Sequence, residues 1–91
     1  MVLPGFAWGD GFSGDRLLRV DGRIAASPED PGAYWQRADL RRETGDFSGA
    51  LEDLGRAADL APGSPSTAIL RARVYLDSGQ ALAALEVLEP V

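Results

Sequence analysis

The sequence predicts an all-α fold made of tandem helix-turn-helix repeats that stack into an α-α superhelix. Between Pro31 and Pro62, large apolar residues recur at helical spacing, and small residues stand where two helices must cross closely. The pattern returns 34 residues later, which indicates a repeat array. The helix-start signal Asp30-Pro31 is duplicated as Ser64-Pro65. The other repeated pairs are Ala38 and Ala72, Gly45 and Gly79, Ala50 and Ala84, Leu51 and Leu85, and Leu54 and Leu88.

Composition places the 91 residues in one small domain and excludes several kinds of site. Ala and Leu are plentiful and β-branched residues are few, which favours helix. Cysteine and histidine are absent, so the sequence offers no disulfide, no thiolate metal site and no imidazole base. We therefore expect no metal and no cofactor. The net charge of −5 argues against nucleic acid, which requires a basic stripe, and against a polybasic membrane-surface site.

Residues 1–14 differ in character from the rest of the chain. Residues 1–9, MVLPGFAWG, are apolar and uncharged, and Ala7 and Gly9 match the small residues of a signal cleavage site. Two interpretations are open. The segment is either the end of a secretory signal, which would indicate export, or an apolar arm that folds back onto the first helix of a protein that stays in the cytoplasm. Residues 9–14, GDGFSG, are predicted to form a loop because they contain three glycines, an Asp and a Ser.

A first helix is predicted over residues 15–26, with Asp15 as its N-cap. One face of this helix carries Leu17, Val20 and Ile24. By the 34-residue register, residues 15–30 correspond to the second helix of a degenerate repeat, so we interpret them as a half repeat.

Two further repeats are expected, at residues 31–64 and, truncated, at residues 65–91. Their helices are predicted over residues 31–44, 47–60, 65–78 and 81–89. Gly45 and Gly79 each follow a first helix, where a left-handed backbone favours glycine. Asp46 is the expected N-cap of the following helix.

The chain from Pro31 to Leu88 resembles the tetratricopeptide repeat family. In the first full repeat the matching residues are Tyr34, Ala38, Gly45, Asp46, Phe47, Ala50, Leu51, Leu54, Ala57, Leu60 and Pro62. In the second they are Ala72, Tyr75, Gly79, Ala84, Leu85 and Leu88. The pattern departs from the family at Arg37 and Arg71, where Leu is frequent, and at Arg41, which replaces an aromatic residue.

The resemblance implies a protein-binding module in which the first helices of successive repeats line a concave groove for a peptide or a partner helix. By register, the groove-facing candidates are Trp35, Asp39, Arg42, Ile69, Arg73 and Leu76. Trp and Arg are also the types most enriched at binding hot spots. In the competing interpretation, Trp35 packs under the N-terminal arm and the arginines form surface ion pairs.

No catalytic constellation is evident, so we expect a non-enzymatic protein. The carboxylates are interpreted as a solvated helix face. A last helix ending near Glu89 leaves an apolar edge with little to pack against, formed by Leu82, Leu85 and Leu88. We therefore expect either a fragment of a longer array or a homodimer formed through that edge.

Overall fold

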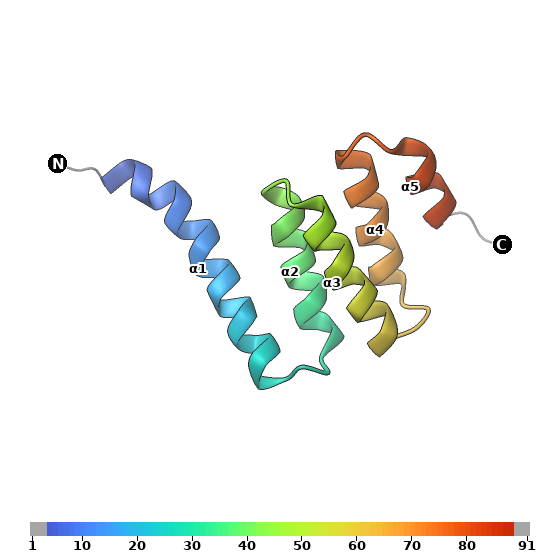
Figure 1. Ribbon diagram of the computed structural model, residues 1–91, viewed down its shortest axis with the longest axis horizontal. Coiled ribbons are helices and arrows are strands. Elements are labelled where there is room, and N and C mark those ends of the chain that lie inside the picture. The colour runs from blue at the N-terminus through green and yellow to red at the C-terminus, as the bar shows by residue number, and fades with distance from the viewer. Residues whose placement is uncertain (1–3, 89–91) are drawn as a thin grey trace.

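The computed structural model describes the backbone of residues 4–88 and the side chains of residues 14–88. Five helices follow one another along this part of the chain: α1 (Pro4–Ala26), α2 (Pro31–Glu43), α3 (Phe47–Leu60), α4 (Pro65–Asp77) and α5 (Ala81–Leu88). No strand is present within residues 4–88, which confirms the predicted all-α fold. Helices α2 to α5 lie side by side and are joined by short turns (Figure 1).

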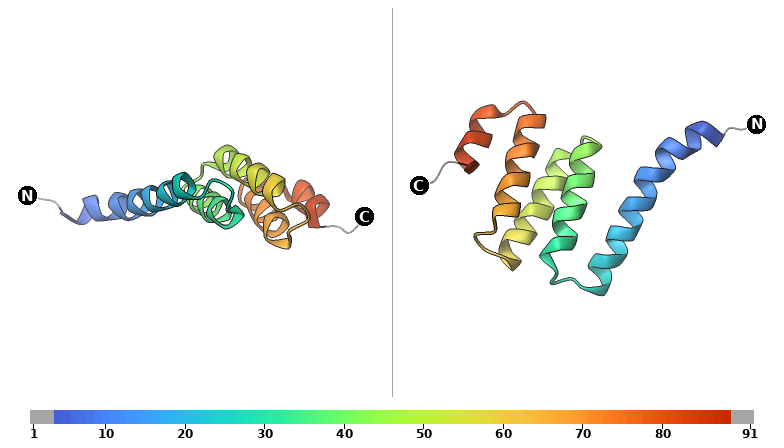
Figure 2. Two further views of the ribbon diagram at one scale, coloured as in Figure 1. Left: turned by 90° about the horizontal axis from the view of Figure 1, so that it is seen from below. Right: turned by 180° about the vertical axis from the view of Figure 1, so that it is seen from behind.

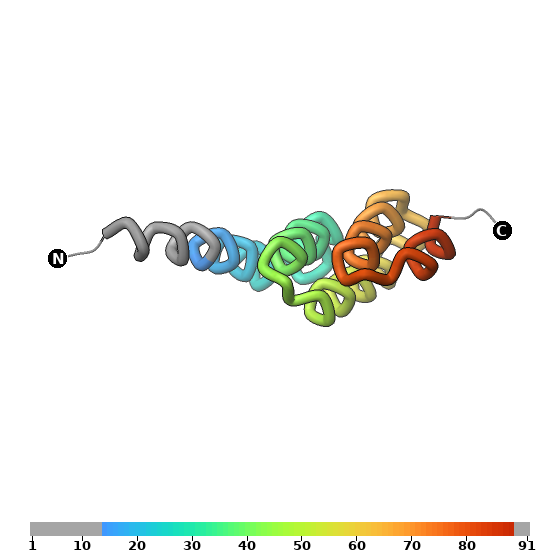
Figure 3. Tube along the Cα trace, turned by 90° about the horizontal axis from the view of Figure 1, so that it is seen from above, coloured from blue at the N-terminus to red at the C-terminus, as the bar shows by residue number. Residues whose placement is uncertain are grey.

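The four repeat helices form two hairpins, α2–α3 and α4–α5. Seen edge-on, α3 lies to one side of α2 and α4, and α5 lies beyond α4 at the C-terminal end of the row (Figures 2 and 3). Helix α4 contacts α2 and α3 of the preceding hairpin as well as α5, whereas α1 contacts α2. Because α4 contacts both helices of the first hairpin, it covers the edge that they share.

The helix ends follow the sequence signals. The carboxylate of Asp30 accepts a hydrogen bond from the backbone N–H of Gly32 at 2.9 Å, and that of Asp46 accepts one from Gly49 at 3.0 Å. The predicted N-caps of α2 and α3 are therefore confirmed. Gly45 and Gly79 adopt φ angles of 88° and 82°, in the left-handed region that glycine enters at little cost. Each of the two preceding helices ends one residue earlier than predicted, at Glu43 and Asp77.

The core lies between the two hairpins and is built on small residues. Ala38 of α2 and Ala50 of α3 are both fully buried, in one cluster with Leu54 and with Val74 of α4. Trp35, Phe47, Leu51 and Leu70 pack around this cluster. The predicted close approach of the helices at these alanines is confirmed, since any larger side chain would have to fit into a space that is already filled.

Helix α1 corrects two predictions. It begins at Pro4 and continues to Ala26, so residues 9–14 are helical rather than a loop, and Asp15 lies inside the helix instead of capping it. Glycine lowers helix propensity by about 1 kcal/mol but does not forbid the helical backbone, and proline is well suited to a first turn. Because residues 4–9 continue α1, the expected arm folded back onto the first helix is wrong for these residues. The side chains of residues 1–9 lie outside the described part, so the signal remnant stays a prediction. The interpretation of residues 15–30 as a half repeat stays a prediction too.

Candidate protein-binding surface

Two of the three predicted groove residues on α2, Trp35 and Arg42, form hydrogen bonds with α4. The indole Nε1 of Trp35 donates a hydrogen bond to Oγ1 of Thr67 at 2.8 Å. Arg42 donates to Oδ2 of Asp77 at 2.6 Å and to Oδ1 of Asp39 at 2.8 Å. These bonds, first to Asp77 and then to Asp39, raise the pKa of Arg42. Trp35 and Arg42 thus join α2 to α4, and Asp39 supports Arg42 from within α2. All three residues are only partly buried, so they still reach the surface.

The predicted groove residues on α4 are exposed. Ile69 is 48% exposed and Leu76 is 57% exposed, and Arg73 between them is also exposed. The three residues lie on one helix face because they are spaced four and three residues apart. Within residues 14–88, Arg73 has no ion pair. The six predicted residues therefore divide into three on α2 that take part in hydrogen bonds and three on α4 that are exposed.

The three leucines predicted at the apolar edge are exposed on α5. Leu82, Leu85 and Leu88 are 79%, 63% and 52% exposed. Together with Glu86 they line an open concavity. This is the surface that the sequence predicts to lack a packing partner, and no described residue covers it.

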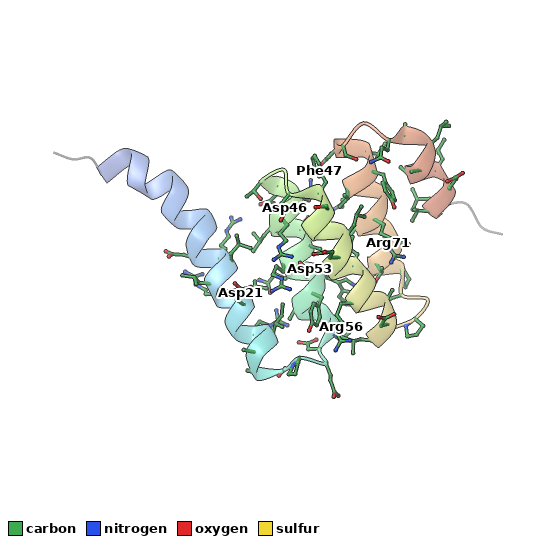
Figure 4. All side chains as sticks on the ribbon, in the orientation of Figure 1. Asp21, Asp46, Phe47, Asp53, Arg56 and Arg71 are labelled. Carbon is green, nitrogen blue, oxygen red and sulfur yellow. The ribbon has the colours of Figure 1, made fainter. Side chains whose placement is uncertain are left out.

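The burial of one carboxylate, Asp53, was not predicted from the sequence. Asp53 of α3 is 3% exposed and lies between α2 and α3 (Figure 4). It accepts hydrogen bonds from Arg37 at 2.8 Å and 3.0 Å and from Arg41 at 3.2 Å. The interpretation of the carboxylates as a solvated face is wrong for Asp53, because two guanidinium groups replace the water that it loses.

The same arginine extends the charge network to the first helix. Nη1 of Arg37 lies 2.9 Å from Oδ1 of Asp21 in α1, and the guanidinium carbon lies 5.9 Å from the ring centre of Tyr34. Hydrogen bonding to Asp53 raises the pKa of Arg37 far above its ordinary value, burial opposes this, and Asp21 adds to it. Arg37 therefore connects three helices through two carboxylates.

A sequence signal for this network did exist. Arg37 and Arg41 are the two positions of the first full repeat where charged residues replace the expected Leu and aromatic residue. They lie one helical turn apart, so they share a face. Two arginines on one helix face require an acidic partner on the facing helix, and Asp53 is that partner. In the second repeat the place of Asp53 is taken by Val87, so the network belongs to the first repeat alone.

The described residues offer no evident site for a metal ion or for a membrane span. No cluster of three or more metal-ligating side chains is found among residues 14–88. Between residues 4 and 88, no helix combines the length and the apolar character needed to cross a membrane.

Comparison with known proteins identifies the family. The model of the tetratricopeptide repeat family matches residues 41–91. Human tetratricopeptide repeat protein 36 is 49% identical over 47 residues, which cover 52% of this chain and 25% of that protein. The chain thus spans about a quarter of the length of this curated relative. No solved structure matches the chain. With a family match over more than half of its length, and with two stacked helical hairpins at the same period, this chain belongs to the tetratricopeptide repeat family.

Proposed function

We propose that this chain is a non-catalytic module that binds a peptide or a partner helix on the side formed by α2 and α4. Tetratricopeptide repeats are generally protein-interaction modules, and the family is typically non-catalytic. The observation that supports this surface is the exposed row Ile69, Arg73 and Leu76 on α4. Such a row combines apolar area with a cation, and arginine is enriched at binding hot spots.

The residues of α2 contribute in a different way. Trp35 and Arg42 form hydrogen bonds to α4, and Asp39 accepts a bond from Arg42, so these residues help to hold α4 in place. We therefore expect substitutions on α4 to affect binding directly, and substitutions on α2 to affect binding and stability together.

A peptide-binding assay tests this proposal. A library of labelled peptides is titrated against the protein, and the best ligand is then titrated against Ile69→Asp, Leu76→Asp and Arg73→Glu. Each variant should weaken binding about tenfold or more if these residues are hot spots. Arg56→Glu is the matched control, since Arg56 is an exposed arginine on α3. Equal loss in the Arg73→Glu and Arg56→Glu variants would show that only net charge matters.

The alternative proposal is self-association through α5, which the exposure of its three leucines favours. Apolar patches of this kind frequently mark interfaces. A homodimer formed at high concentration should then become a monomer when Leu85 and Leu88 are both replaced by Glu. Light scattering measures the mass, and far-ultraviolet circular dichroism checks that the variant is folded. A monomer for the unchanged protein at high concentration contradicts this second proposal.

A further inference from the structure

The first hairpin shows how an edge of this fold is covered. Its edge is formed by α2 and α3, and α4 packs against both. The covering face of α4 carries Thr67, Leu70, Val74 and Asp77, spaced three, four and three residues apart. Thr67 accepts the bond from Trp35 near the start of α2, and Asp77 pairs with Arg42 near its end. Helix α4 therefore lies parallel to α2.

The second hairpin presents the equivalent edge without a cover among the described residues. At the 34-residue period, Leu51 and Leu54 of α3 correspond to Leu85 and Leu88 of α5. Leu54 is 0% exposed beneath α4, whereas Leu88 is 52% exposed. On the other helix of each hairpin, Trp35 corresponds to Ile69, which is 48% exposed. We name this second surface the α4–α5 edge, made of Ile69, Arg73, Leu76, Leu85 and Leu88.

We propose that the α4–α5 edge binds one amphipathic helix of a partner, parallel to α4. The inference rests on the proposed protein-binding function and specifies its ligand. The chain itself supplies the precedent, because the same fold elements 34 residues earlier hold a helix in this position. A helix that binds in an apolar groove presents apolar residues at spacings of three and four. On the covering face of α4, Leu70 and Val74 have the spacing of four.

The polar positions of the two edges are different, and this difference defines the chemistry of the partner. The Trp35 N–H and the Arg42 guanidinium of the first edge correspond to Ile69 and Leu76, which carry no polar group. The partner helix should therefore be apolar where α4 has Thr67 and Asp77. The acidic Asp39 is replaced by the basic Arg73, so an acidic residue is expected near the middle of the partner helix.

The same comparison argues against a second copy of α4 as the partner. Its Thr67 hydroxyl and Asp77 carboxylate would meet Ile69 and Leu76, which cannot pair with either group. Burying a carboxylate without a partner is strongly unfavourable. In its own chain, α4 also already uses this face to cover α2 and α3.

Synthetic helices test the inference. The first peptide copies residues 65–78, and the second copies the same residues with Thr67→Leu, Asp77→Leu, Arg71→Glu and Arg73→Glu. Fluorescence anisotropy of labelled peptides measures binding to the unchanged protein. The second peptide should bind at least about tenfold more tightly than the first. Its two added leucines match Ile69 and Leu76 of the protein, and its added glutamates can pair with Arg73. Circular dichroism of the mixture should show that the bound peptide gains helix.

Protein variants show whether the peptide occupies this edge. Leu88→Glu should weaken binding of the second peptide about tenfold or more, whereas Leu18→Glu, at a leucine of α1 that is 70% exposed, should not. Arg73→Glu should also weaken it. A version of the second peptide that keeps Arg71 and Arg73 should bind the Arg73→Glu protein more tightly than it binds the unchanged protein.

Several results would overturn the inference. Equal affinity of the two peptides would remove the predicted selectivity, and loss of binding in the Leu18→Glu control would show that the effect is not local. A dimer that Leu88→Glu dissociates would make a second copy the occupant. If library peptides require Ile69, Arg73 and Leu76 but not Leu85 or Leu88, the proposed function stands and this inference fails.

Discussion

Asp53 of α3 and Arg37 of α2 form a buried two-point contact. Oδ1 of Asp53 lies 2.8 Å from Nη2 of Arg37, and Oδ2 lies 3.0 Å from Nε. The side chain of Asp53 is 4% exposed and that of Arg37 is 20% exposed, so the pair is shielded on the acidic side and reaches solvent on the basic side. This contact joins the two helices of the first full repeat at the position where the second repeat has Val87.

Removing the buried carboxylate should destabilise the protein. Asp53→Ala leaves Arg37 and Arg41 without their shared acceptor, and breaking a buried pair costs about 3–5 kcal/mol. Because both arginines are partly solvated, we expect a loss of about 3 kcal/mol in the free energy of unfolding. Urea denaturation measures the loss. Glu52→Ala, at the exposed neighbouring carboxylate, should change the same quantity by no more than about 0.5 kcal/mol.

The buried hydroxyl of Thr67 should be needed for the stacking of the hairpins. Thr67→Val keeps the shape of the side chain but removes the acceptor of the Trp35 N–H, which costs about 1–3 kcal/mol if the indole is left unpaired. Thermal and urea unfolding report this change. Ser66→Ala is the control, because it removes an exposed hydroxyl from the same turn of α4. Equal effects of the two substitutions would mean that the Trp35–Thr67 bond adds nothing to stability.

The helix crossing at Ala50 should not accept a larger side chain. Ala50 is fully buried between α2 and α3, so Ala50→Leu forces the helices apart and should lower the free energy of unfolding by about 1–3 kcal/mol. Ala25→Leu makes the same change at an exposed position of α1 and should leave stability nearly unchanged. An unaltered melting temperature for Ala50→Leu would contradict the packing of this repeat.

The stability that the N-cap Asp30 gives to the start of α2 should depend on pH. Hydrogen bonds from Arg23 and then from the Gly32 N–H lower the pKa of Asp30 below its ordinary value of 3.8. A pKa lowered by folding stabilises the folded state above the ordinary value, and this stabilisation disappears as the pH falls through the lower, folded value. Titration of the carboxylate by nuclear magnetic resonance should find this lowered pKa. Asp30→Asn should remove the corresponding part of the acid dependence of unfolding, and an unshifted Asp30 would contradict the observed cap.

The sequence alone determined the helices of the repeats, because each helix begins and ends at signals in the neighbouring residues. Asp30 and Asp46 cap the helices that follow them, and Gly45 and Gly79 adopt the backbone that ends the helices before them. Such signals act within a few residues, so a linear reading finds them. The same local reasoning failed for residues 9–14, where glycine weakens a helix without breaking it.

Only the tertiary structure decided which side chains are available for binding. Trp35 and Ile69 occupy equivalent positions in the two repeats, yet Trp35 contacts α4 and Ile69 is exposed. Likewise, Asp53 and Glu52 are adjacent carboxylates, and only Asp53 is buried. Burial and pairing depend on a neighbouring helix supplied by a distant part of the chain, and helical periodicity carries no information about that neighbour.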